Sequence, residues 1–175
     1  MCGLALNSAG MLPGESEMDS LTWETVAEEF VFDGSWRDIY MLDTDIDAWQ
    51  RVLDQLRRTE YDLVYRRGGD VCELPRSAPD AFPVEGMADR YLSVKFADVL
   101  ANCHFFTREE IEFDIDPREV NGQRQLDALL TFMRLLCDAT DREVTLTPEN
   151  SPEIVIFRAL PGQPAIEYCE FGGWR

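Results

Sequence analysis

Residues 110–116, Glu-Ile-Glu-Phe-Asp-Ile-Asp, alternate strictly between acidic and apolar side chains. Successive side chains of a β-strand point to opposite faces of its sheet, so this pattern predicts a strand with one apolar face and one charged face. The stretch therefore predicts an antiparallel sheet that is buried on one side and acidic on the other. The acidic row consists of Glu110, Glu112, Asp114 and Asp116.

Further strands are predicted on both sides of this stretch. Alternation from Tyr91 to Phe96, a turn near Ala97-Asp98 and an apolar run after it indicate an antiparallel meander. Gly68-Gly69, between two strand-like runs, is typical of a tight hairpin turn. The other predicted strands are Trp36–Leu42, Tyr61–Arg67, Val71–Leu74, Val99–Phe106, Glu143–Thr147 and Glu153–Ala159.

Two amphipathic helices are predicted between the strands. The first spans Asp45–Arg58, and Thr44 is expected to cap it, with Asp47 completing a capping box. The second spans Gln123–Asp138, and a shorter helical pattern covers residues 23–30. The apolar stripe of the first helix is Trp49, Val52, Leu53 and Leu56, and that of the second is Leu126, Leu129, Leu130, Met133, Leu136 and Cys137.

These elements predict an α+β fold with a largely antiparallel sheet. The two main helices are expected to pack on one face, in a ferredoxin-like or related split β-α-β arrangement. The predicted organisation is a flexible N-terminal lead (1–19), a single α+β domain (20–160) and a Gly/Pro-rich C-terminal tail (161–175). A Pro-rich connection around residues 75–90 is long for a compact domain, so it is expected to be functional or mobile.

The charge balance restricts the partners of this chain. It carries 34 acidic and 16 basic residues, for a net charge of −18, with one histidine. A surface this acidic repels nucleic acid phosphates and anionic lipid, and it attracts basic partners. A coding bias that favours arginine over lysine, or adaptation of the surface to a salty cytosol, would also produce such a composition.

The cysteines and the apolar runs indicate the cellular compartment of the protein. The five cysteines are scattered and form no C-x-x-C motif, which favours buried free thiols in a reducing compartment. No apolar run reaches the length of a membrane span, and the first residues lack the basic start of a secretory signal. We therefore expect a cytoplasmic protein that binds neither membrane nor nucleic acid.

The sequence contains no recognisable catalytic or metal-binding motif, and no catalytic residue, metal ligand or cofactor is predicted. Cys103 and His104 are adjacent, but successive side chains on a strand point to opposite faces and cannot form a nucleophile pair. Asp43, Asp45 and Asp47 resemble the start of a calcium loop, but Ala48 stands where that loop needs glycine. Helix capping accounts for these three acids more simply.

Three functional hypotheses follow. The favoured one is a non-enzymatic binding protein that docks a basic protein partner through its acidic face, as inhibitors and toxin-immunity proteins do. The alternatives are a small enzyme that uses carboxylates and His104 or Cys103 near the Pro-rich loop, and a structural or oligomerisation module with a salt-adapted surface. The predicted binding residues are Glu110, Glu112, Asp114 and Asp116, together with Trp36 and Trp174 as glycine-flanked anchors.

Overall fold

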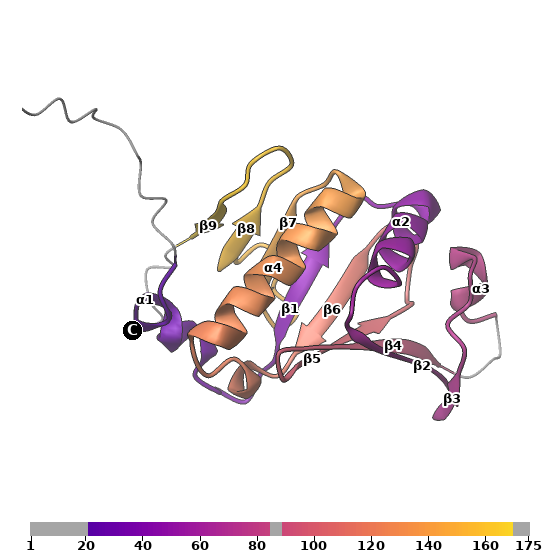
Figure 1. The fold of residues 1–175 in the computed structure, drawn as a ribbon, viewed down its shortest axis with the longest axis horizontal. Coiled ribbons are helices and arrows are strands. Elements are labelled where there is room, and N and C mark those ends of the chain that lie inside the picture. The colour runs from indigo at the N-terminus through magenta and orange to yellow at the C-terminus, as the bar shows by residue number, and fades with distance from the viewer. Residues whose placement is uncertain (1–20, 85–88, 170–175) are drawn as a thin grey trace, which may run out of the picture.

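The computed structural model describes residues 21–84 and 89–169, so the predicted lead at 1–19 and Trp174 lie outside the described residues. The chain forms an α+β structure around a large antiparallel sheet (Figure 1). Its helices are α1 (Trp23–Val26), η1 (Ala27–Phe30), α2 (Ile46–Leu56), α3 (Ala78–Ala81), η2 (Pro117–Glu119) and α4 (Gln123–Thr140). Its strands are β1 (Arg37–Met41), β2 (Asp62–Arg67), β3 (Asp70–Cys72), β4 (Arg90–Phe96), β5 (Val99–His104), β6 (Ile111–Ile115), β7 (Val144–Pro148), β8 (Phe157–Ala159) and β9 (Ile166–Tyr168).

The nine strands of the described residues lie in the order β3-β2-β4-β5-β6-β1-β7-β8-β9, and every described pairing is antiparallel. Consecutive strands form the meander β4-β5-β6, as the alternation predicts. β1 comes first in the chain, yet it lies between β6 and β7 in the middle of the sheet. This insertion places residues of β1 beside the acidic row of β6.

One face of the sheet carries the core. Phe132 of α4 stacks on Phe96 of β4, with ring centroids 4.6 Å apart, and meets Phe113 of β6 edge-on at 5.3 Å. α2 contacts α4, and Figure 1 shows the two helices side by side in front of the sheet. Fully burying a large apolar side chain contributes about 2 to 3 kcal/mol, so these aromatic contacts are a main source of stability. The alternate side chains of the strands point to the opposite face, called the open face below.

The start of α2 is fixed by its cap. Asp45 is the N-cap of α2, and its Oδ1 accepts a hydrogen bond from the Ala48 N–H at 2.7 Å. The prediction of Thr44 as the cap is therefore wrong by one residue. The Thr44 hydroxyl instead donates to the carbonyl of Arg108, and its N–H donates to the carbonyl of Glu109. Thr44 thus ties the helix start to the loop before β6.

The predicted α+β class and antiparallel sheet are confirmed. The sheet is larger than a ferredoxin-like arrangement would have, because the β2–β3 hairpin extends one edge and β8 and β9 extend the other. The short helical pattern at 23–30 divides into α1 and η1, and the Pro-rich connection contains the single turn α3. β9 lies within the range predicted as a C-terminal tail, where it pairs with β8.

Candidate functional site

A continuous row of polar side chains crosses the centre of the open face. The strand register aligns Ser93 with Asn102, Asn102 with Asp114, Asp114 with Asp38, and Asp38 with Thr147. These five residues come from β4, β5, β6, β1 and β7 in that order. Strand alternation predicts the outward orientation of each one, and the register brings them into one line.

Three residues of this row, Asn102, Asp114 and Asp38, line a cavity of about 450 Å³. Its lining combines four acids with aromatic and amide side chains from several strands and from the segment after β7. We call Asp38, Glu112, Asp114 and Glu149 the cavity carboxylates. The remaining lining residues are Trp36, Tyr91, Asn102, His104 and Asn150.

Hydrogen bonds hold two of the cavity carboxylates in place. Oδ2 of Asp38 accepts from the Tyr40 hydroxyl at 3.0 Å and from the Asn150 N–H at 2.7 Å. Oδ1 of Asp114 accepts from Nδ2 of Asn102 at 3.2 Å, and Asn102 in turn accepts from the Ser93 hydroxyl. Asp38 is held from its own strand and from the segment after β7, and Asp114 from the neighbouring strand β5, so these two carboxylates of the cavity are preorganised.

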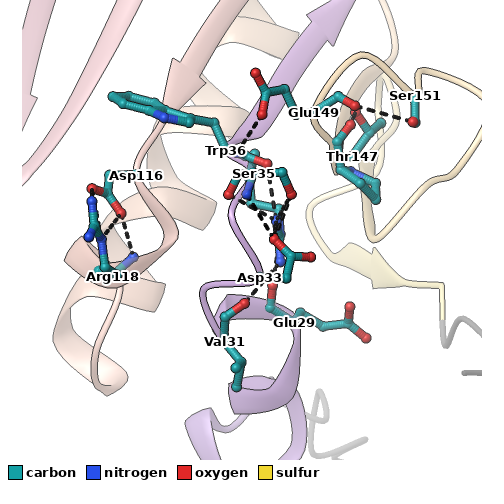
Figure 2. Close-up of polar contacts among 12 residues, drawn as sticks. Glu29, Val31, Asp33, Ser35, Trp36, Asp116, Arg118, Thr147, Glu149 and Ser151 are labelled. Carbon is teal, nitrogen blue, oxygen red and sulfur yellow. Dashed lines mark hydrogen bonds and ion pairs between the residues drawn. The ribbon is translucent and has the colours of Figure 1, made fainter. Parts of the chain in front are cut away.

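A third carboxylate is positioned at the rim of the cavity. Oε2 of Glu149 accepts a hydrogen bond from the Trp36 N–H at 2.9 Å, and the Glu149 N–H donates to the Trp36 carbonyl (Figure 2). This reciprocal pair joins the start of β1 to the segment after β7. In Figure 2 the Trp36 ring projects away from Thr147 and Ser151.

Three of the cavity carboxylates, Asp38, Glu112 and Asp114, have raised pKa values. Burial raises the pKa of Glu112 from 4.5 to about 7, and the negative charges of Asp38, Glu110 and Asp114 add to this effect. Burial also raises the pKa of Asp38 and that of Asp114; repulsion from Asp114 adds to the rise at Asp38. Like charges that share a site disfavour joint ionisation, so the cavity favours an incoming positive charge.

The ion pairs that arginines form in the described residues involve acids outside the cavity. Among the described residues, none of the cavity carboxylates forms an ion pair with arginine or lysine. Among the described residues that line the cavity, the one basic side chain is His104, whose Nε2 lies 3.5 Å from Oδ2 of Asp114. Ion pairs elsewhere join Arg37–Asp33, Arg57–Asp54, Arg118–Asp116, Arg124–Asp98, Arg134–Asp138, Arg142–Asp45, Arg158–Glu143 and Arg158–Glu167.

Aromatic rings form part of the cavity lining. The His104 imidazole stacks on Phe106, with centroids 5.1 Å apart and planes within 5°, and its other neighbour is Tyr91 at 5.7 Å. Phe106 is 74% exposed and lies outside the cavity lining, beside His104. Trp36 lines the cavity from the start of β1. The cavity therefore combines negative charge with exposed π faces.

The structure brings together three of the residues predicted for binding. Glu112, Asp114 and Trp36 line the same cavity. Glu110 precedes β6 and is not part of the cavity lining. Asp116 follows β6, where its carboxylate caps η2 and pairs with Arg118 at 2.6 Å (Figure 2). Trp174 lies outside the described residues, so its predicted role stays a prediction.

Sequence reasoning missed Asp38, Asn102 and Glu149. The pattern Arg37–Met41 contains a usable signal, since Asp38 and Tyr40 alternate with apolar residues as Glu112 and Asp114 do. That signal predicts the face of the sheet on which Asp38 lies. It does not predict the residues next to Asp38 on adjacent strands, because these depend on the position of β1 in the sheet.

Cys103 and His104 point to opposite faces of the sheet. Cys103 is buried, and burial raises the pKa of its thiol, whereas His104 lines the open cavity. Within residues 21–84 and 89–169, no group of three or more His, Cys, Asp or Glu side chains is arranged to hold a metal ion. None of the described helices combines the length and apolar character needed to cross a bilayer.

Comparison of the chain with protein-family models, with curated proteins and with solved structures finds no match. The class that the fold and the cavity define is an α+β protein with an acidic, aromatic-flanked cavity on the open face of its sheet. The chemistry of that cavity is therefore what bears on its function.

Proposed function

We propose that the protein is a small, non-enzymatic binding protein that docks a basic protein partner on the open face of its sheet. Inhibitors and toxin-immunity proteins act in this way in the cytoplasm. The observation that carries the proposal is the set of cavity carboxylates, which has no arginine or lysine partner among the described residues. Elsewhere in the described residues, eight acids form ion pairs with arginine.

The energetics of the cavity support this proposal. Repulsion among the cavity carboxylates costs free energy in the unbound protein, and a positive group from a partner would remove that cost. The net charge of −18 would also steer a basic partner toward the protein and raise the association rate at low salt. Neither effect requires any chemical step.

The experiment is affinity capture from a lysate of the source organism with three versions of the protein. These are the wild type, a cavity variant (Glu112→Gln with Asp114→Asn) and a control variant (Glu110→Gln with Asp116→Asn). Both variants remove two carboxylates from the same stretch, so net charge is matched. The proposal expects a basic protein that the wild type and the control retain, that the cavity variant loses, and that high salt releases.

Capture that is lost equally with both variants would show attraction by net charge alone and would contradict docking at the cavity. A captured protein without excess basic residues would contradict the proposed partner class.

One observation favours a second candidate, an enzyme. His104 contacts Asp114 inside the cavity, which is the arrangement of a histidine oriented for acid–base work. The test is a hydrolase and transferase substrate panel with wild type and His104→Ala. An activity lost on His104→Ala and on Asp114→Asn, but retained by Asp116→Asn, would support the enzyme. An activity that survives His104→Ala would contradict it.

A further inference from the structure

We infer that the cavity on the open face binds one arginine side chain of the partner, with the guanidinium group held among the cavity carboxylates and against the flanking aromatic rings. This inference rests on the proposed function and specifies which group of the basic partner enters the site. The identity of the occupant follows from the charge of the cavity, from its hydrogen-bonding capacity and from its aromatic lining.

The charge of the cavity requires a cationic occupant. Four carboxylates surround it, and His104 is the one basic side chain among the described lining residues. The opposite face of the sheet is occupied by its own core helices, so this cavity lies on the face that the described helices α2 and α4 leave open. Charge complementarity therefore selects a basic group for the unpartnered face.

The hydrogen bonds leave acceptors free for such a group. The donors from Tyr40, Asn150 and Asn102 occupy Oδ2 of Asp38 and Oδ1 of Asp114. Among the described residues, Oδ1 of Asp38 accepts no hydrogen bond, and Oδ2 of Asp114 has only the 3.5 Å contact with His104. Acceptors on two adjacent strands suit a planar donor with several N–H groups.

The aromatic lining distinguishes arginine from lysine. A guanidinium is planar, presents five N–H donors and stacks on aromatic faces, whereas an ammonium is compact and strongly hydrated. Tyr91 already has a guanidinium over its ring, since Cζ of Arg66 lies 5.6 Å from the ring centroid. The Trp36 ring offers a further aromatic face at the cavity itself. A cavity of about 450 Å³ is also large for an ammonium group.

The sequence narrows the source of the arginine. Residues 1–20 and 85–88 contain no lysine or arginine, so those segments cannot supply a basic side chain. Residues 170–175 contain Arg175, and a second copy of the chain would present exposed arginines such as Arg67 and Arg76. These two occupants are alternatives to a partner protein, and the experiment separates them.

The experiment titrates three blocked tripeptides into isotope-labelled full-length protein and follows amide and indole signals by NMR. The peptides are acetyl-Gly-Arg-Gly-amide, its lysine counterpart and its citrulline counterpart, which keeps the shape of arginine without the charge. The expected result is saturable shifts at Trp36, Asn102 and Asn150 with the arginine peptide. The lysine peptide is expected to bind at least about fivefold more weakly, and the citrulline peptide not to bind.

Variants locate the site. Asp114→Asn is expected to weaken the arginine peptide by about tenfold, since it removes a charged acceptor from the cavity. Asp116→Asn makes the same charge change two residues along the chain, outside the cavity lining, and is expected to leave the affinity unchanged. Equal affinity for the arginine and lysine peptides would overturn the inference. So would an equal loss of affinity for the arginine peptide in Asp114→Asn and Asp116→Asn.

The alternative occupants have their own readouts. If the arginine peptide binds to the Arg175→Gln variant but not to the wild type, Arg175 of the chain itself fills the cavity and keeps a partner's arginine out. If the protein self-associates and Asp114→Asn abolishes the association, the occupant is a second copy. Both outcomes overturn the inference as stated.

The capture experiment separates this inference from the proposed function. A partner that is lost with the cavity variant but is not displaced by excess arginine peptide would support docking and overturn the arginine occupant. Arginine binding without any cavity-dependent capture would support the occupant chemistry and contradict the proposed partner class.

Discussion

Asp38 on β1 and Asp114 on β6 lie directly opposite each other on neighbouring antiparallel strands, and both face the same cavity. Like charges at directly opposed positions destabilise a sheet, and Asp38 is only 2% exposed. The Tyr40 hydroxyl and the Asn150 N–H offset part of that cost at Asp38, and Asn102 does so at Asp114. A strained acidic pair that is held in place by hydrogen bonds is consistent with a site prepared for a positive ligand.

We predict that stability falls as pH rises from about 4.5 to about 7, in part because of Glu112. The pKa of Glu112 is raised in the folded protein to about 7, so the folded state binds this proton more tightly than the unfolded state does. The stabilising contribution is complete below the ordinary value of 4.5 and is lost as pH rises through about 7. Glu112→Gln is expected to reduce this loss by about 1 to 3 kcal/mol.

Urea denaturation at pH 5 and pH 8 measures the effect, and Glu110→Gln is the matched control. Glu110 lies outside the cavity lining, so its substitution is expected to change the pH dependence less. Identical pH dependence in the wild type and in Glu112→Gln would contradict the prediction.

Tyr40→Phe is predicted to destabilise the protein by about 1 to 2 kcal/mol, because it removes a donor from the buried carboxylate of Asp38. Burial and the adjacent charge of Asp38 raise the pKa of Tyr40, so its hydroxyl stays protonated and donates throughout the ordinary pH range. Chemical denaturation at pH 7 measures the change. Adding Tyr40→Phe to an Asp38→Asn variant should lower the free energy of unfolding by less than Tyr40→Phe does in the wild type. An equal loss in both backgrounds would show that the Tyr40 hydroxyl does not act through Asp38.

Asp45→Ala is predicted to cost about 1 kcal/mol, because the Asp45 side chain caps α2 at the Ala48 N–H. Asp45→Asn is the control, since asparagine caps about as well as aspartate. Thermal or urea unfolding of both variants measures the difference. If the two variants lose the same stability, the loss comes from the ion pair of Asp45 with Arg142 rather than from the cap.

Phe106→Ala is predicted to separate binding from stability. Phe106 is 74% exposed and contributes a ring face beside His104, so its loss should change the free energy of unfolding by less than about 0.5 kcal/mol. We expect the same substitution to weaken partner binding severalfold, because it removes an exposed aromatic contact next to the cavity. Chemical denaturation tests the expected stability, and a binding titration with the captured partner tests the expected loss of affinity. Unchanged binding would place the contact surface elsewhere.

Phe132→Ala is predicted to destabilise the protein by about 3 to 5 kcal/mol, because Phe132 is fully buried between α4 and the sheet. Its ring contacts Phe96 and Phe113, whose strands carry the open face on their other side. Urea unfolding measures the loss, and Phe132→Leu should recover more than half of it. If Phe132→Ala lowers the free energy of unfolding only as little as substitution of a surface residue does, the packing described for α4 is contradicted.

Local patterns accounted for much of the secondary structure. The alternation at 110–116 predicted β6, and the apolar stripes predicted α2 and α4 to within a few residues at each end. The cap of α2 was misassigned, because Thr44 and Asp45 are both good capping residues and a tertiary contact with the loop before β6 decides between them. Such contacts lie far apart in sequence, so no local rule contains them.

The sequence by itself determined the α+β class, the faces of the strands and the excess of negative charge, because periodicity and composition are local properties of the chain. Only the tertiary structure decided that β1 lies between β6 and β7. That strand order brings Asp38 beside Asp114 and joins Glu149 to Trp36. Strand order depends on pairing between segments far apart in sequence, so the cavity exists only once β4, β5, β6 and β1 and the segment after β7 have come together.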